Sequence, residues 1–302
     1  MKEKNIKLSL YIKSLRKEKG WTMTKLAEKA EISLEQLKRI EKGNYDKAIS
    51  PAAKKVLAVF GKSDEDLLMA LDPQIKRAFD HQVAKARDFA FKKDHMNLAL
   101  ELSALKQTYQ EYEPFDYIKQ TLLLLEGTVF YEKDTKNQSL TLLTKALKLS
   151  RSDLIVSGGK KNITLDTDKI HKQAFSKLEY HIITEIANGL AVFGQYVHAI
   201  EIYQVLLLSY ETNYTDELMI NRAKPVILYN LAFSFNRLQA YQEAVSFGQQ
   251  GIDVCKQTGN TRPLLHLYKL MGDIHRHMGH CQKANDYMES YEKLLGLLER
   301  SQ

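Results

Sequence analysis

Cysteine, proline and glycine are scarce in this 302-residue sequence, which contains two Cys, five Pro and 14 Gly. The cysteines, Cys255 and Cys281, fall in different predicted helices, so they make neither a disulfide framework nor, by themselves, a metal site. Few Gly and Pro residues disfavour a β-sandwich with its many turns. No apolar run reaches the roughly 18 residues of a membrane span, and the N-terminus lacks the apolar core of a signal peptide. We therefore expect an all-α protein that is cytoplasmic and not attached to a membrane.

The positive charge of the chain is concentrated at its N-terminal end. Residues 1–62 contain 16 Lys and Arg against 7 Asp and Glu, whereas the remaining residues contain 28 against 30. A basic segment beside a nearly neutral one is typical of a nucleic-acid-binding domain joined to a regulatory domain, although a solvated lysine-rich face would also explain the charge. Because the length exceeds what one compact core usually holds, we predict two domains, residues 1–72 and 73–302.

Start and stop signals divide the first domain into five short helices. Thr22, Ser33 and Ser63 are placed to cap helix N-termini, and Gly20 and Gly43 follow helix ends. The predicted helices are one that ends at Gly20, then residues 23–30, 34–42, one from Pro51 to Gly61, and 64–71. Two helices joined by about three residues form the arrangement in which one of them enters the major groove of DNA.

The segment Leu26-Ala27-Glu28-Lys29-Ala30-Glu31-Ile32-Ser33, with Leu37, Ile40-Glu41 and Gly43 after it, resembles the phage-repressor-like (Xre-type) helix-turn-helix family over residues 6–71. Arg16 and Glu41 match positions where that family often has an ion pair between the first and third helices. The chain departs from the family at Glu31, where Gly is usual, and a positive φ there would cost about 1 kcal/mol. The alternative for this segment is a helical dimerisation module that does not bind DNA.

The resemblance also implies which side chains contact DNA. Arg39 would bind guanine with its fork of donors, Glu35 would accept from cytosine, and Leu34 would touch a thymine methyl group. The expected base-facing residues are Leu34, Glu35, Gln36 and Arg39. The expected phosphate-binding residues, which position the protein without reading sequence, are Thr22, Lys25, Ser33, Lys38 and Lys42.

Internal repeats follow Pro73. A small residue recurs twelve positions after another one, in the pairs Gly127 and Ser139, Ala187 and Ala199, Ala232 and Ala244, and Gly272 and Ala284. Small residues at these positions let the two helices of a hairpin touch, and the pattern resembles tetratricopeptide (TPR) repeats. With a first divergent hairpin at about 75–110, it predicts five repeats in a right-handed α-solenoid, the last extended by Tyr291 to Glu299. Residues 151–172, with Gly158-Gly159, are expected to form an extended loop.

A TPR-like solenoid implies a concave surface lined by the first helix of each hairpin. Amides beside aromatic rings suit an extended peptide, because Asn can bond its backbone on both the donor and the acceptor side. The expected peptide-binding residues are Tyr131, His181, Thr184, Asn188, Tyr229, Asn230, Phe233, Asn236, Lys269, Asp273 and Arg276, with Glu185, Arg237 and His277 beside them. The alternative is that these are ordinary solvated positions of a repeat scaffold.

Catalytic and metal chemistry is not indicated. His266, His275, His277, His280 and Cys281 are close in sequence, but residues 275 and 277 point to different faces of a helix. No phosphate-binding glycine loop, nucleophile elbow or His-Glu-x-x-His motif occurs. We therefore expect no enzyme, no cofactor and no metal.

The order of the two modules, a repressor-like helix-turn-helix and then TPR-like repeats, resembles the RRNPP (Rgg/PlcR/PrgX-like) group of peptide-pheromone receptors from Gram-positive bacteria. The resemblance implies a homodimer on a pseudo-palindromic operator in double-stranded DNA and a short peptide bound by the repeats. Peptide binding would shift the population of two arrangements of the dimer. Two alternatives remain: the repeats dock a protein partner, or the chain is a TPR adaptor that does not bind DNA.

Overall fold

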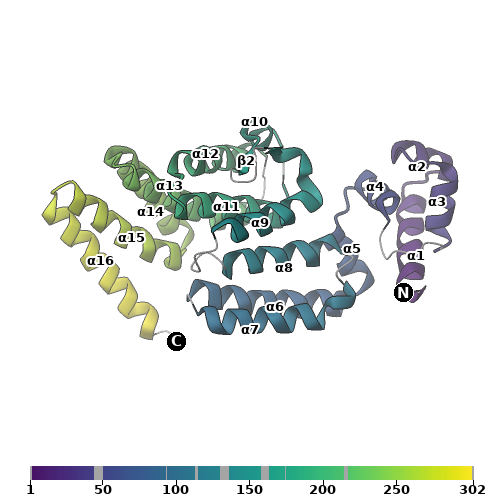
Figure 1. Ribbon diagram of the computed structural model, residues 1–302, viewed down its shortest axis with the longest axis horizontal. Helices are drawn as coiled ribbons and strands as arrows, with labels where there is room; N and C mark the ends of the chain where they lie inside the picture. Colours follow the sequence, from purple (N-terminus) through teal and green to yellow (C-terminus); the bar gives the residue numbers. More distant parts are fainter. Residues whose placement is uncertain are drawn as a thin grey trace. The chain divides into compact units, whose positions relative to one another are not determined.

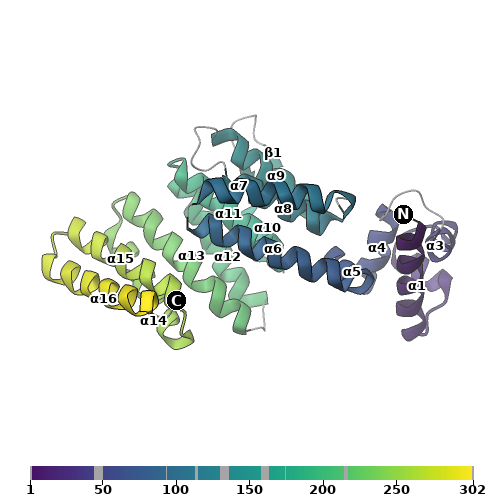
Figure 2. The same ribbon diagram turned by 90° about the horizontal axis from the view of Figure 1, so that it is seen from below.

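The computed structural model describes residues 2–43, 50–92, 94–112, 115–129, 136–157, 163–173, 175–213 and 217–300. The described chain is mainly helical (Figures 1 and 2). It divides into two compact units, Met1–Val129 and Phe130–Gln302. The predicted all-α class is confirmed. The predicted domain boundary at 72/73 lies inside the first unit and stays a prediction.

The first unit begins with the five predicted short helices. Apolar side chains from all five, among them Leu8, Leu26, Leu37, Leu57 and Leu68, are buried in one core. The helices are α1 (Lys2–Glu18), α2 (Met23–Lys29), α3 (Leu34–Glu41), α4 (Pro51–Val59) and α5 (Asp64–Leu71).

The turn between α2 and α3 contains Glu31 in the left-handed conformation, which is unfavourable for a residue other than glycine. Glu31 has a φ of 50°, in the left-handed region that favours glycine. Its amide nitrogen donates to the carbonyl oxygen of Glu28 at 3.1 Å, and the amide nitrogen of Ile32 donates to that of Ala27 at 3.1 Å. The tight turn therefore forms despite the side chain at position 31.

Three longer helices complete the first unit: α6 (Pro73–Phe91), α7 (His95–Thr108) and α8 (Asp116–Val129), with a short 3-10 helix, η1 (Gln110–Tyr112), before α8. Helices α6 and α7 pack side by side (Figure 1). Phe79 and Ile118 belong to the same hydrophobic core as the helices of the first 72 residues. Asp72 connects the two parts, because its side chain caps α6 and accepts from the amide nitrogen of Ile75 at 3.2 Å.

The second unit is built of helical hairpins. Helix α11 pairs with α12, α13 with α14 and α15 with α16, while the first helices α11, α13 and α15 also contact one another in order. The helices are α9 (Lys136–Arg151), α10 (Thr167–His171), α11 (Lys177–Val192), α12 (Tyr196–Asn213), α13 (Glu217–Arg237), α14 (Tyr241–Thr258), α15 (Thr261–His277) and α16 (Cys281–Arg300). Helix α16 continues through Tyr291 to Glu299, as predicted.

The spacing of small residues has the predicted cause. Ala187, Ala199, Ala232 and Ala244 are fully buried in their hairpins. A Cβ atom added at Gly272 would lie 3.4 Å from the carbonyl oxygen of Ala284, twelve residues further along the chain. The two helices of this last hairpin therefore touch at the small pair.

The extended loop predicted at 151–172 is wrong for the described residues. A 3-10 helix, η2 (Ser152–Leu154), leads into strand β1 (Ile155–Ser157), which pairs antiparallel with β2 (Ile163–Leu165) and is followed by α10. Ile155 faces Leu165 in the register of this hairpin. Short β-branched runs on either side of Gly158-Gly159 favour a hairpin, a signal that the polar composition of the segment obscured.

Candidate functional site

Helix α3 exposes the residues that were predicted to face DNA bases. Leu37 and Ile40 are buried on one side, whereas Leu34, Glu35, Gln36 and Arg39 are exposed on the other. The helix starts with a capping box. Ser33 Oγ accepts from the Gln36 amide nitrogen at 3.1 Å, and Gln36 Oε1 accepts from the Ser33 amide nitrogen at 2.9 Å. Since its oxygen is engaged in the cap, Gln36 has its side-chain NH2 group available for a base.

Glu35 and Arg39 lie one helical turn apart and form an exposed ion pair. Arg39 Nε lies 3.9 Å from Glu35 Oε1, and the side chains are 70% and 68% exposed. An exposed pair of this kind is weak, so both side chains can leave it to bind elsewhere.

The orientation of α3 is set by Arg16 on α1. Arg16 Nε and Nη2 donate to the two carboxylate oxygens of Glu41 at 2.6 and 2.8 Å, and Nη1 donates to the carbonyl oxygen of Trp21 at 2.9 Å. These bonds to Glu41 raise the pKa of the Arg16 guanidinium. The pair predicted between the first and third helices is thus present, with the fork geometry that fixes direction as well as distance.

The predicted phosphate-binding residues lie at both ends of the helix-turn-helix. Thr22 caps α2, with its hydroxyl oxygen accepting from the amide nitrogen of Lys25 at 3.2 Å. The ammonium groups of Lys25 and Lys29 lie 5.8 and 5.1 Å from the centre of the Trp21 ring. Lys29 was not among the predicted residues, and its position four residues after Lys25 places both on one helix face. Ser33, Lys38 and Lys42 belong to α3 and its caps.

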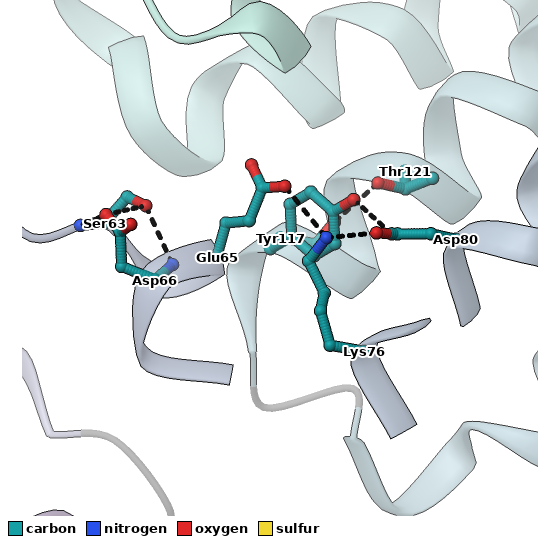
Figure 3. A network of polar contacts seen from close by, with 7 residues as sticks. All are labelled: Ser63, Glu65, Asp66, Lys76, Asp80, Tyr117 and Thr121. Atoms are coloured by element: carbon teal, nitrogen blue, oxygen red, sulfur yellow. Dashed lines mark hydrogen bonds and ion pairs between the residues drawn. The ribbon is translucent and has the colours of Figure 1, made fainter. Parts of the chain in front are cut away.

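A buried lysine ties α5 to α6 and α8 (Figure 3). Lys76 is 4% exposed and pairs with Asp80 on its own helix and, at 2.9 Å, with Glu65 of α5. Tyr117 of α8 donates its hydroxyl to Asp80 Oδ1 at 2.8 Å, and its ring lies under the Lys76 ammonium at 4.7 Å. Burial alone would lower the pKa of Lys76, but the hydrogen bonds to Asp80 and Glu65 outweigh it and raise the pKa.

A second set of polar contacts crosses the same junction. Lys54 of α4 pairs with Asp116 at the start of α8 and lies 3.7 Å from Asp64 of α5. The amide nitrogen of Asp116 donates to Asp64 Oδ2 at 2.9 Å, and the Tyr112 hydroxyl donates to Asp72 Oδ2 at 3.2 Å. The helix-turn-helix segment is therefore bonded to the helices after it at several points within one unit.

In the second unit, two predicted ligand residues from successive hairpins meet. Asn230 of α13 donates from Nδ2 to Asn188 Oδ1 of α11 at 2.9 Å. The same oxygen accepts from the hydroxyl of Tyr203 of α12 at 2.5 Å. Tyr203 was not among the predicted residues, because the expected binding surface was lined only by the first helix of each hairpin. A tyrosine on the buried side of a helix needs a hydrogen-bond partner for its hydroxyl, and this requirement could have indicated a polar contact at position 203.

Two aromatic side chains lie on α13 close to Asn230. Tyr229 and Phe233 stack with ring centres 6.5 Å apart, and the Tyr229 ring lies 6.2 Å from that of His266 on α15. Burial and the negative charge of Asp273 raise the pKa of Tyr229. One turn beyond Phe233, Asn236 Oδ1 lies 3.1 Å from His277 Nδ1.

The remaining predicted ligand residues make local contacts. His181 Nε2 lies 3.7 Å from Glu185 Oε1, and Thr184 donates its hydroxyl to a carbonyl oxygen of its own helix. Asp273 pairs with Arg276 at 3.0 Å, and the Lys269 ammonium lies 6.0 Å from the ring of Tyr291. Among the described residues, no hydrogen bond or ion pair joins these side chains to Asn188 or Asn230. Tyr131 lies outside the described residues.

The described part of the chain contains no group of three or more His, Cys, Asp or Glu residues able to hold a metal ion. None of its helices is long and apolar enough to cross a membrane.

Comparisons with known proteins give one family model and several solved structures. The family model Helix-turn-helix matches residues 12–67. PlcR from Bacillus thuringiensis, solved in complex with the peptide PapR7 and DNA, is 17% identical, with a TM-score of 0.61 over 97% of this chain and 96% of that one. A comparison with curated proteins found no match.

Two structures of ComR have lower TM-scores. Apo ComR from Streptococcus vestibularis is 17% identical, with a TM-score of 0.49 over 96% of this chain and 92% of that one. ComR from S. thermophilus, in complex with DNA and its signalling peptide ComS, is 15% identical, with a TM-score of 0.48 over 98% and 95%.

The structural likeness to PlcR extends over nearly the whole length of both chains. The predicted order of modules and the predicted helical-repeat fold are therefore confirmed. The N-terminal part of this chain, residues 12–67, is a helix-turn-helix domain, and the chain as a whole has the fold of PlcR.

Proposed function

We propose that this protein is a sequence-specific DNA-binding transcription regulator controlled by a short signalling peptide that binds to its helical repeats. The observation that carries the proposal is the exposed polar face of α3, held by the Arg16–Glu41 brace inside a helix-turn-helix domain. The fold supports control by a peptide, because PlcR, which has the same fold, has been solved with both a peptide and DNA.

DNA binding is assigned to residues 1–72. Arg39, Glu35, Leu34 and the amide of Gln36 read base edges, and the lysines and caps around α2 and α3 bind phosphates. One such module gives modest affinity. A homodimer on a pseudo-palindromic operator, with half-sites about 34–36 Å apart, binds far more tightly because the second contact is intramolecular.

Peptide binding is assigned to residues 73–302, chiefly to the amides and aromatic rings of α11 and α13. The pair formed by Asn188 and Asn230 supports this, since it brings hydrogen-bonding groups from two hairpins to one place. A peptide that binds one arrangement of the dimer more tightly than another shifts the population toward it, and with it the affinity for the operator.

Regulation of this kind requires binding and no catalytic step, so we propose that the chain is not an enzyme and needs no cofactor. It would act in the cytoplasm, where the DNA is. The helix-turn-helix domain and the fold support this placement.

Fluorescence-anisotropy titration of the full-length protein on DNA from its own promoter region, at two salt concentrations, tests the proposal. We expect tight binding that weakens steeply with salt, because bound lysines release counterions. Arg39→Ala should weaken binding at the specific sequence by about 1–3 kcal/mol, the worth of one bidentate base contact. Arg77→Ala, which removes an equally basic exposed residue from α6, is the matched control. Flat curves at both salt concentrations would refute DNA binding.

A further inference from the structure

We propose that Tyr203 is a positioning residue that holds the carboxamide of Asn188 in the orientation that leaves its nitrogen, together with the oxygen of Asn230, free to bind a backbone amide of the ligand. The inference rests on the proposed function, and it deepens it by assigning a role to a residue of a second helix. It follows from the hydrogen-bonding capacity of the three side chains.

The oxygen of Asn188 is fully used. A carboxamide oxygen accepts two hydrogen bonds, and Asn188 Oδ1 receives one from the Tyr203 hydroxyl and one from Asn230 Nδ2. Among the described residues, Asn188 Nδ2 and Asn230 Oδ1 have no partner, and neither atom is among the buried polar atoms left unsatisfied. Both atoms are therefore in contact with solvent.

Two free groups of this kind match one peptide unit. Asn188 Nδ2 can donate to a backbone carbonyl oxygen, and Asn230 Oδ1 can accept from a backbone N–H. The match depends on the orientation of Asn188, since rotation by half a turn would bring its NH2 group against Asn230 Nδ2, which only donates, and would take the acceptor away from the Tyr203 proton.

Tyr203 is suited to hold that orientation. It is 1% exposed and extends from α12, which packs against α11, and Ala199 one turn earlier on α12 is fully buried. Burial, with a smaller effect of the nearby Glu185 carboxylate, raises the pKa of Tyr203 well above its ordinary value, so the hydroxyl keeps its proton. The hydroxyl can also accept a hydrogen bond, but among the described residues its proton has no acceptor other than Asn188 Oδ1. Turning the NH2 group of Asn188 toward it would leave that proton without an acceptor, so the contact favours the oxygen.

The test compares two tyrosines that each lose one hydroxyl. Tyr203→Phe removes the donor to Asn188, whereas Tyr180→Phe removes an equally buried hydroxyl that bonds Ser209 Oγ at 2.7 Å. The probe is a heptapeptide selected from a random display library on the full-length wild-type protein, and calorimetry gives its Kd. We expect Tyr203→Phe to weaken binding roughly tenfold, equivalent to about 1.4 kcal/mol. Tyr180→Phe should bind as the wild type does.

A double-mutant cycle separates positioning from a general loss of structure. Once Asn188→Ala has removed the carboxamide, Tyr203→Phe should cost nothing more, because there is no group left to orient. Wild-type affinity in Tyr203→Phe, or an equal loss in both backgrounds, would overturn the positioning role and leave the proposed function intact. If no library peptide binds the wild type, peptide control itself fails and the role of Tyr203 with it, whereas the DNA titration is unaffected.

Discussion

Both carboxylate oxygens of Glu41 accept hydrogen bonds from the guanidinium group of Arg16, at 2.6 and 2.8 Å. The two side chains are only 6% and 13% exposed, so the pair lies largely out of solvent. Because Glu41 is the last residue of α3 and Arg16 lies near the end of α1, this contact sets the direction of the helix that carries Arg39.

Glu41→Ala should therefore lower both stability and specific DNA binding. Removing one partner leaves the other charge largely buried and unpaired, which costs about 3–5 kcal/mol. Urea unfolding of the full-length protein measures the loss. Glu35→Ala, which breaks an exposed pair on the same helix, should cost less than about 1 kcal/mol. Equal losses of unfolding free energy in the two variants would contradict the structural role of the Arg16–Glu41 pair.

Glu31→Gly should stabilise the protein. Glu31 has a φ of 50°, and removing its side chain relieves left-handed strain worth about 1–2 kcal/mol in the folded protein. Glycine also stabilises the unfolded chain by about 0.4–1 kcal/mol through its greater backbone entropy, which offsets part of that gain. Thermal unfolding measures the difference. The same change in the preceding helix, Glu28→Gly, has no strain to relieve and should destabilise by about 1 kcal/mol. A fall in melting temperature for Glu31→Gly would show that its side chain contributes more than its backbone strain costs.

Lys76→Ala should loosen the junction between α5 and α6. The substitution removes the ion pairs to Glu65 and Asp80 and the contact with the Tyr117 ring, so we expect a loss of about 2 kcal/mol or more. Hydrogen exchange should become faster in α5 and in the first turns of α6. Lys85→Ala is the control, because Lys85 is more than half exposed in its pair with Glu101. Unchanged exchange at the junction in Lys76→Ala would refute its role.

The two cysteines should differ sharply in reactivity. Cys255 is 1% exposed, and burial raises the pKa of its thiol to about 11, whereas Cys281 is exposed. At pH 8 a thiol-specific reagent should therefore modify one cysteine in the native protein and both after unfolding, since the thiolate is the reactive form. Cys281→Ser should abolish the native reaction. Rapid labelling of that variant would contradict the burial of Cys255.

The same thiol makes stability depend on pH at the alkaline end. The folded-state pKa lies above the unfolded one, so the contribution of Cys255 is complete below the ordinary thiol pKa near 9 and is lost as pH rises toward 11. Cys255→Ala should remove the part of the fall in unfolding free energy at alkaline pH that comes from this thiol. Unfolding curves between pH 8 and 10.5 for the variant and the wild type provide the comparison.

Local signals in the sequence were sufficient to place most helices. Thr22, Ser33 and Ser63 cap helices where they were expected to, and Glu31 has the predicted unfavourable φ. These features depend on residues within one or two turns of each other. The twelve-residue spacing of small residues also needed no structure, because contact across a tight helical hairpin is nearly local.

Contacts between residues far apart in sequence were decided by the tertiary structure. Tyr203 meets Asn188 and Asn230 only because three helices pack at particular angles, and Lys76 reaches Glu65 and Tyr117 only through the crossing of α5, α6 and α8. No periodicity in the sequence encodes such angles. Thus residue type and local spacing determined the elements, whereas the direction of packing determined which polar side chains lie within bonding distance.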